Sequence, residues 1–162
     1  PRPESLKPLD HLAAGAKIAY NDRKYSKGYP AGGDNALVDG KLGGWFYKDN
    51  RWQGFLCDVD VTIDLGAVKD IHYVGATFLS HTSAGVGFPV RTEVSFSEDG
   101  QTYSEPVVCL LQVPDNDSCA LLNTLGSAVN AKARYVKYRA VRDDVTKNRN
   151  HAFIFIDEIV VN

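Results

Sequence analysis

Residues 59–65 have the sequence Val-Asp-Val-Thr-Ile-Asp-Leu and are followed by Gly66. Apolar and polar side chains alternate over this stretch without a break. Because successive side chains of a β-strand point to opposite faces of a sheet, the pattern predicts a strand with one buried and one exposed face. The glycine that follows is typical of a turn.

Other segments along the chain also predict strands, some by alternation and some by runs of apolar and β-branched residues. The Asp99-Gly100 pair predicts a chain reversal, and only residues 5–15 offer a short helix. Strands separated by glycine-marked turns, without a helical period, predict an all-β fold. We therefore expect an antiparallel β-sandwich. The further predicted strands are 71–79, 90–96, 103–111, 134–141 and 152–161.

The length and composition fit one domain with one core. The chain has 162 residues, of which 44% are hydrophobic and 23% are charged. It begins at Pro1 and contains no methionine, which predicts a piece excised from a longer protein. We expect residues 1–14 to be a linker or N-terminal extension and residues 15–162 to be the domain. No apolar run is long enough for a membrane-spanning helix.

The net charge and the three cysteines exclude only a few classes of binding partner. A net charge of −2 gives no basis for binding to nucleic acid or to an acidic membrane. Three cysteines, Cys57, Cys109 and Cys119, match no zinc-binding pattern. Cys109 and Cys119 could close a short disulfide loop, and buried free thiols remain the alternative. Five basic residues on or beside one predicted strand indicate a solvated face: Lys132, Arg134, Lys137, Arg139 and Arg142.

The familiar catalytic motifs are missing from the sequence. It has no phosphate-binding loop, no zinc-protease motif and no dinucleotide-binding glycine pattern. Residues 81–85 carry a serine, but His81 replaces the first glycine of a nucleophile elbow. We therefore expect a domain that binds rather than catalyses.

The loop chemistry indicates what such a domain binds. Residues 21–58 form a long segment without a strand pattern, and loops of this length are usually functional. Aromatic rings stack on the apolar faces of sugars, and polar side chains bind the hydroxyl groups. We expect Trp45 to be buried, whereas Trp52 could be either a buried plug or an exposed stacking ring. Five aromatic residues lie within eleven positions: Trp45, Phe46, Tyr47, Trp52 and Phe55.

Five short motifs occur in an order that matches a known family. They are Val-Asp-Gly-Lys-Leu-Gly-Gly-Trp at 38–45, Val-Thr-Ile-Asp-Leu-Gly at 61–66, Val-Ser-Phe-Ser-Glu-Asp-Gly at 94–100, Ala-Arg-Tyr-Val-Lys-Tyr at 133–138 and Asp-Glu-Ile-Val-Val at 157–161. The series resembles the discoidin, or coagulation-factor type C, domains, which include the family-32 carbohydrate-binding modules.

A subgroup of that family is similar in further detail. Trp52-Gln53-Gly54, Phe88-Pro89 and the ending at 153–159 resemble domains at the C-termini of bacterial β-N-acetylhexosaminidases of the chitobiase kind. The resemblance implies a jelly-roll β-sandwich, like that of galactose-binding domains, with a ligand site in the loops at one end.

The resemblance also implies a structural calcium ion. Asp39 and Glu158 match the family's side-chain ligands, and backbone carbonyls of residues 36–44 would complete the oxygen shell. The chain departs from the family pattern at Lys41 and Gly44, where Asn or Asp and Thr are common.

The sugar site differs from that of the galactose-binding members. These carry histidine where this chain has Phe46, arginine where it has His81, and asparagine near Gly87. Galactose specificity is therefore not implied. We expect stacking from Trp52 or Phe88. Hydroxyl contacts are expected from the polar residues of a candidate site formed by Phe46, Trp52, His81, Phe88, Asn148, His151 and Phe153.

The resemblance implies a non-catalytic carbohydrate-binding module of a larger glycoside hydrolase. Its partners would be a glycan containing N-acetylhexosamine or galactose and the catalytic domain of the same chain. Its location would be extracellular or periplasmic in a bacterium. The alternative is a structural domain that docks on the hydrolase and binds no sugar.

Overall fold

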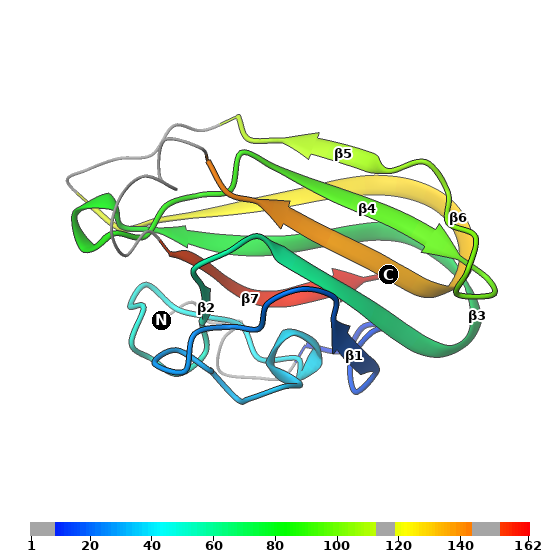
Figure 1. Ribbon diagram of the computed structural model, residues 1–162, viewed down its shortest axis with the longest axis horizontal. Coiled ribbons are helices and arrows are strands. Elements are labelled where there is room, and N and C mark those ends of the chain that lie inside the picture. Colours follow the sequence, from blue (N-terminus) through cyan, green and yellow to red (C-terminus); the bar gives the residue numbers. More distant parts are fainter. Residues whose placement is uncertain (1–8, 113–118, 144–152) are drawn as a thin grey trace.

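The alternating segment forms the first part of β3 (Val59–Ser80), the longest strand of the protein. Figure 1 shows the computed structural model, which describes residues 9–112, 119–143 and 153–162. The apolar side chains at positions 59, 61, 63 and 65 are buried, and the polar ones between them are partly exposed. The predicted strand 59–65 and its buried face are therefore confirmed, but the turn expected at Gly66 is not formed: β3 continues to Ser80 and includes the predicted strand 71–79.

Two long strands connect the two layers of the fold. β3 pairs with β6 (Leu121–Val141) in antiparallel register along most of its length. The register shifts between Asp64 and Lys69 and again between Ile71 and Tyr73. Such irregularities bend strands, and Figure 1 shows both strands curving round at the same end of the molecule. Each strand thus contributes one half to each layer.

The remaining strands extend these two layers. The first half of β3 pairs with β1, and the second half of β6 pairs with β4, which in turn pairs with β5. The second half of β3 pairs with β7, which pairs with β2. The bounds are β1 Lys17–Tyr20, β2 Gln53–Phe55, β4 Arg91–Ser97, β5 Val107–Leu110 and β7 Ile154–Val161, with 3-10 turns η2 Ala36–Val38 and η3 Thr82–Ala84.

The architecture is an all-β antiparallel sandwich, as predicted, and the described residues contain no α-helix. None of them forms a helix that could cross a membrane. Two strands were not predicted from the sequence: β1, and β2 inside the long segment 21–58. The first half of β6 was also missed, because small and polar residues there obscure the alternation.

The N-terminal boundary differs from the expected one. Residues 9–14 are part of the domain: His11 and Ala13 are buried. The Leu9 amide donates to the carbonyl of Gly40 at 2.6 Å, and the Leu12 amide donates to that of Val161 at 2.7 Å. Residues 12–15 form a turn rather than the expected helix.

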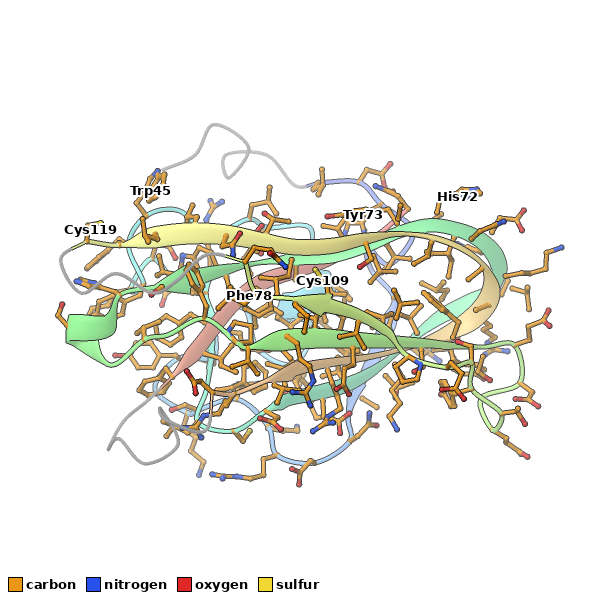
Figure 2. All side chains as sticks on the ribbon, turned by 90° about the horizontal axis from the view of Figure 1, so that it is seen from above. Trp45, His72, Tyr73, Phe78, Cys109 and Cys119 are labelled. Atoms are coloured by element: carbon orange, nitrogen blue, oxygen red, sulfur yellow. The ribbon has the colours of Figure 1, made fainter. Side chains whose placement is uncertain are left out.

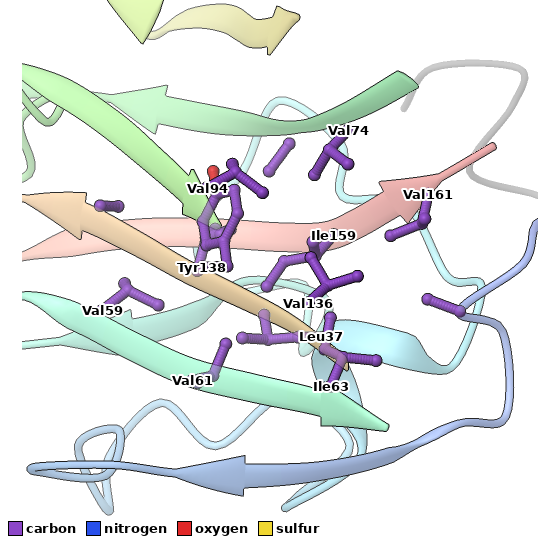
Figure 3. Close-up of a cluster of buried hydrophobic side chains, with 14 of the residues drawn as sticks. Leu37, Val59, Val61, Ile63, Val74, Val94, Val136, Tyr138, Ile159 and Val161 are labelled. Carbon is purple, nitrogen blue, oxygen red and sulfur yellow. The ribbon is translucent and has the colours of Figure 1, made fainter. Parts of the chain in front are cut away.

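The core lies between the two layers. Figure 3 shows side chains from β3, β4, β6 and β7 meeting there with Leu37 of η2. Fully buried members include Val61, Ile63, Val136 and Ile159. The two layers thus share one continuous apolar cluster.

The three cysteines are free thiols. Cys57 is buried, Cys109 is partly exposed and Cys119 is exposed. Figure 2 shows Cys119 near one end of the sandwich and Cys109 well away from it. A disulfide between Cys109 and Cys119 is therefore not formed.

Two valines of β3 test the importance of the buried face. Val61 is 0% exposed and Val68 is 45% exposed. We expect Val61→Ala to lower the free energy of unfolding by about 2 to 3 kcal/mol, because it removes buried methyl groups and leaves a cavity. Val68→Ala should cost less than about 0.5 kcal/mol. Urea titration measures both, and equal losses would contradict the assigned faces.

Candidate functional site

Three segments distant in sequence meet where the second half of β3 ends. Residues 81–87 leave this strand and turn back beside Phe153, which precedes β7. The Phe153 amide donates to the Gly85 carbonyl at 2.7 Å, and the Gly87 amide donates to the Phe153 carbonyl at 3.0 Å. Residues 42–52 supply the third segment. Backbone hydrogen bonds therefore fix the first two segments relative to each other.

Tyr47 joins these segments through its ring. Its centroid lies 5.5 Å from that of Phe46, 6.1 Å from His81 and 5.8 Å from Phe155. Distances of this size are typical of favourable aromatic pairs. The structure thus brings the predicted residues Phe46 and His81 together through a residue that was not predicted.

Phe153 joins the same cluster from the other side. Its ring centroid lies 5.4 Å from Phe155 and 5.1 Å from Tyr29. Tyr29 in turn lies 6.2 Å from Tyr47. We call Tyr29, Phe46, Tyr47, His81 and Phe153 the aromatic loop cluster.

Trp52 does not offer a stacking face. It is 1% exposed and packs with Leu79, Val86 and Phe155. Its indole Nε1 donates to the Gly44 carbonyl at 3.0 Å. Of the two possibilities left open for Trp52, the buried plug is therefore the observed one.

The backbone packs tightly over the Trp52 ring. An ideal Cβ at Gly43 would lie 2.2 Å from a ring carbon. Only glycine permits this close approach. The loop that carries Trp45 and Phe46 therefore rests directly on the Trp52 ring.

Phe88 is also buried, at 2% exposure, within the main core. The stacking role expected for it is thus not available. Trp45 was expected to be buried but is 54% exposed, and Figure 2 shows it at the outer surface. Phe46 is 58% exposed. The most exposed rings of this end are therefore those of Trp45 and Phe46, while Tyr47 is partly exposed.

A hollow of about 310 Å³ lies beside the aromatic loop cluster. Tyr29, Tyr47 and Trp52 line it together with Lys48 and Asn50. The Lys48 ammonium lies 5.6 Å from the centroid of the Tyr47 ring, a cation–π contact. Rings beside an ammonium and an amide offer both kinds of contact that a sugar requires.

Two of the expected sugar contacts, Asn148 and His151, lie outside the described residues. Sequence reasoning missed Tyr29 and Tyr47 as site residues. Tyr47 belongs to the aromatic residues within positions 45–55, so the sequence did contain a signal for it. Tyr29 had no such signal, because only the fold brings it beside Phe153.

The proposed calcium ligands form a buried acidic pair. Glu158 is 0% exposed and lies beside the half-buried carboxyl of Asp39. Glu158 Oε2 accepts from His11 Nε2 at 2.7 Å and from the Gly40 amide at 2.7 Å. Among the described residues, Glu158 Oε1 is buried and has no hydrogen-bond partner.

The imidazole of His11 is fixed in one tautomer. Its Nδ1 accepts from the amides of Ala13 at 3.2 Å and Val161 at 3.3 Å. Nε2 therefore carries the proton that is donated to Glu158. Burial lowers the pKa of His11, which favours the neutral ring.

Burial raises the pKa of Glu158 to about 10, and the carboxyls of Asp39 and Asp157 act in the same direction. Burial also raises the pKa of Asp39. A nearby cation would instead favour the charged carboxylates. Without a cation, the raised pKa values of Asp39 and Glu158 favour a proton on this pair of carboxyls.

These residues fit a hard cation. The partnerless Oε1 of Glu158, next to the Asp39 carboxyl, supplies the oxygen donors that Ca²⁺ prefers. The described residues contain no group of three or more His, Cys, Asp or Glu side chains placed to hold a metal. Backbone carbonyls would therefore complete the shell. Lys41 is exposed and, within the described ranges, forms no ion pair with Asp39.

The fold and these loops define a discoidin-type β-sandwich with its candidate site at one end. The F5/8 type C domain model matches residues 19–159, so the chain belongs to the F5/8 type C family. The resemblance inferred from the motifs is thereby confirmed. No curated protein sequence matches this chain.

Solved structures share the fold at low sequence identity. CpGH89CBM32-5 from Clostridium perfringens, in complex with GalNAc-β-1,3-galactose, is 20% identical, with 94% of this chain and 99% of that chain covered and a TM-score of 0.57. CBM32-1 from a family 31 glycoside hydrolase of Clostridium perfringens is 19% identical over 96% and 99%, with a TM-score of 0.59.

The C-terminal domain of a chitobiase from Bacteroides fragilis is likewise similar. It is 20% identical, with 94% of this chain and 97% of that chain covered and a TM-score of 0.56. These likenesses confirm the jelly-roll sandwich fold of family-32 carbohydrate-binding modules.

The contrasting exposures of the two tryptophans can be tested by fluorescence. In Trp45→Phe the remaining Trp52 is 1% exposed, so we expect blue-shifted emission and weak quenching by acrylamide. In Trp52→Phe the remaining Trp45 is 54% exposed, so quenching should be several-fold stronger. Equal quenching in the two folded variants would contradict the assignment of Trp52 as the plug.

Proposed function

We propose that this domain is a non-catalytic carbohydrate-binding module that binds glycan through the aromatic loop cluster. The observation that carries the proposal is the exposed Phe46 ring packed at a tilt against Tyr47, which in turn contacts His81. The aromatic rings would stack on the apolar face of a pyranose. His81, Lys48 and Asn50 would bind its hydroxyl groups.

The ligand class follows from this chemistry and from similar proteins. The Clostridium perfringens module described above is bound to GalNAc-β-1,3-galactose. A related module from that organism is in complex with GlcNAc-α-1,4-galactose, at 14% identity. We take glycans containing N-acetylhexosamine or galactose as the ligands of this domain. Asn148 and His151 remain proposed contacts.

The parent protein would be a glycoside hydrolase of the β-N-acetylhexosaminidase, chitobiase-like, kind. Support comes from the similarity to a chitobiase C-terminal domain. Tethering a hydrolase to its glycan raises the local concentration of substrate. Such an enzyme would act in the extracellular or periplasmic space of a bacterium. The catalytic domain of the parent chain would be the domain's second partner.

The alternative function is docking on the catalytic domain without sugar binding. One observation favours it: Val108 and Leu110 of the edge strand β5 are 49% and 58% exposed. Exposed apolar side chains on an edge strand can serve as contacts for a neighbouring domain. This face does not overlap the aromatic loop cluster.

We further propose that Asp39 and Glu158 hold a structural Ca²⁺. The ion would neutralise the buried Glu158 carboxylate and the half-buried Asp39 carboxylate, and it would fix residues 39–44 beside the aromatic loop cluster. This role is separate from ligand binding. His11 and the Gly40 amide would keep Glu158 oriented through its other oxygen.

The sugar site makes a quantitative prediction for Phe46. We expect Phe46→Ala to weaken binding of GalNAc-β-1,3-galactose at least about tenfold, because a stacking ring is lost. Leu110→Ala is the matched control, since both side chains are 58% exposed and Leu110 lies on β5. Isothermal titration calorimetry measures both affinities. Unchanged affinity of folded Phe46→Ala would contradict the proposed site.

The calcium site predicts a metal-dependent thermal stability. Ca²⁺ at about a hundred times its Kd should raise Tm by roughly 5–10 °C, and chelator should reverse the shift. Asp39→Asn should abolish the shift, whereas Asp70→Asn, at a side chain that is 70% exposed, should retain it. Differential scanning calorimetry with Ca²⁺, Mg²⁺ and chelator gives the comparison. A shift that persists in Asp39→Asn would assign the ion to other residues.

A further inference from the structure

We propose that the outer face of the layer containing β1, β4 and the second half of β6 carries a second carbohydrate-binding groove, separate from the aromatic loop cluster. The groove has a volume of about 540 Å³, within the range typical of small-molecule sites. We call it the distal groove. Its polar and aromatic lining is formed by Asn21, Asp99, Gln101, Tyr103, Tyr135 and Lys137.

The strand register places the floor of the groove on the sheet. Lys137 pairs with Thr62 of β3, and Tyr135 pairs with Asp64. Residues two apart on a strand share a face, so Tyr135 and Lys137 project to the same side. The buried residue between them, Val136, points into the core. The floor therefore faces away from the apolar interior.

The distal groove lies far from the aromatic loop cluster. Its floor is next to the bend in the middle of β3, whereas His81 follows Ser80, the last residue of that strand. At about 3.3 Å per residue, the strand from the bend to Ser80 separates the two places by roughly 30 Å. A single monosaccharide cannot reach both.

The wall of the groove is a well-ordered turn. Asp99 Oδ1 accepts from Ser97 Oγ at 3.0 Å and from the amides of Gln101 at 2.8 Å and Thr102 at 2.9 Å. Gly100, with φ of +80°, lets the backbone reverse. A prearranged wall loses little conformational entropy when a ligand binds.

The same turn holds the Tyr135 ring in place. An ideal Cβ at Gly100 would lie 3.1 Å from Cε2 of Tyr135, so backbone and ring are in close contact. The Arg134 guanidinium also lies 5.1 Å from the ring centroid. Tyr135 is thus fixed as one aromatic surface of the groove.

Tyr103 provides the second aromatic surface. The Lys137 Nζ lies 5.8 Å from its ring centroid. Burial raises the pKa of Tyr103. The phenol is therefore neutral. Two half-buried tyrosines facing one groove offer apolar faces for a pyranose.

Lys137 differs from the other cations of this sheet face. Arg139 contacts Asp58 at 3.0 Å and Glu93 at 3.3 Å, and Arg134 forms two hydrogen bonds to Asp64. Lys137 is exposed and makes no ion pair within the part of the chain that the structure describes. Its ammonium thus remains available as a donor in the groove.

The balance of charge favours a neutral sugar over an acidic one. Hydrogen bonds from the Thr102 and Gln101 amides lower the pKa of Asp99, which remains a charged acceptor. Lys137 supplies one positive charge and Asp99 one negative charge to the same groove. A carboxylate on the ligand would be repelled by Asp99, whereas hydroxyl groups can bind both residues. The ligand class is therefore a neutral hexopyranose.

Two sites about 30 Å apart would give avidity for a branched or repeated glycan. Occupation of both by one chain slows dissociation without any new contact at either site. The inference concerns a different surface from that of the proposed function, so each can fail without the other.

The test is an amide NMR titration of ¹⁵N-labelled protein with GalNAc-β-1,3-galactose as the probe. We expect shifts at residues 99–103 and 135–137 as well as at the aromatic loop cluster. Lys137→Ala and Tyr103→Ala should each weaken the distal response at least about tenfold, because a charged donor or a stacking ring is lost. Phe46→Ala should leave the distal response unchanged.

Lys132→Ala is the matched control for Lys137→Ala. Lys132 is an exposed lysine on the same strand, and its Nζ lies 4.0 Å from Asp70 outside the groove. A distal response that is lost in Lys137→Ala but kept in Lys132→Ala supports the groove. Silence at 99–103 and 135–137 while the loop cluster saturates overturns it. A distal response alone supports the groove and overturns the loop-end site, and silence at both overturns both.

Discussion

The antiparallel pairing of β3 with β6 is the interaction on which the rest of the structure depends. The pairing register shifts where both strands bend, so that a single pair of continuous strands supplies both layers of the sandwich. The first half of β3 alternates buried and partly exposed residues, whereas its last seven residues are all buried. The change in pattern reflects the change of layer.

This pairing determines where function can reside. The bend of β3 and its C-terminal end lie at opposite ends of the sandwich, and the inward faces of the strands between them are committed to the core. Loops can vary in sequence without disturbing that core. The aromatic loop cluster thus stands on a rigid base, with Trp52 and Phe155 packed directly beneath it. Glu158 holds the start of the same loop by accepting a hydrogen bond from the Gly40 amide.

The strands could be predicted because their signal is local. A period of two follows from backbone geometry, so residues 59–65 and 90–96 were assigned without knowledge of the fold. The first half of β6 could not be found in this way, because small and polar residues there obscure the alternation; one of them, Gly126, packs against the Tyr73 ring. The positions of His11 and Tyr29 depend on contacts with residues far away in sequence.

The two tryptophans show most clearly what the sequence could not predict. Tryptophan is usually buried, yet Trp45 is exposed and Trp52 is buried. The difference arises from Gly43, whose missing side chain admits the Trp52 ring beneath the loop. Such a close approach leaves no periodic pattern in the sequence. The family resemblance pointed to this loop but could not say which of its rings faces solvent.

Glycan recognition is the central claim, and a glycan-array screen of the folded protein tests it most directly. The array is run once with Ca²⁺ and once with chelator. We predict binding to glycans that carry N-acetylhexosamine or galactose, with weaker binding in chelator because the loop above Asp39 is less well held. An array without signal from folded, calcium-loaded protein would contradict the account and favour docking on a catalytic domain.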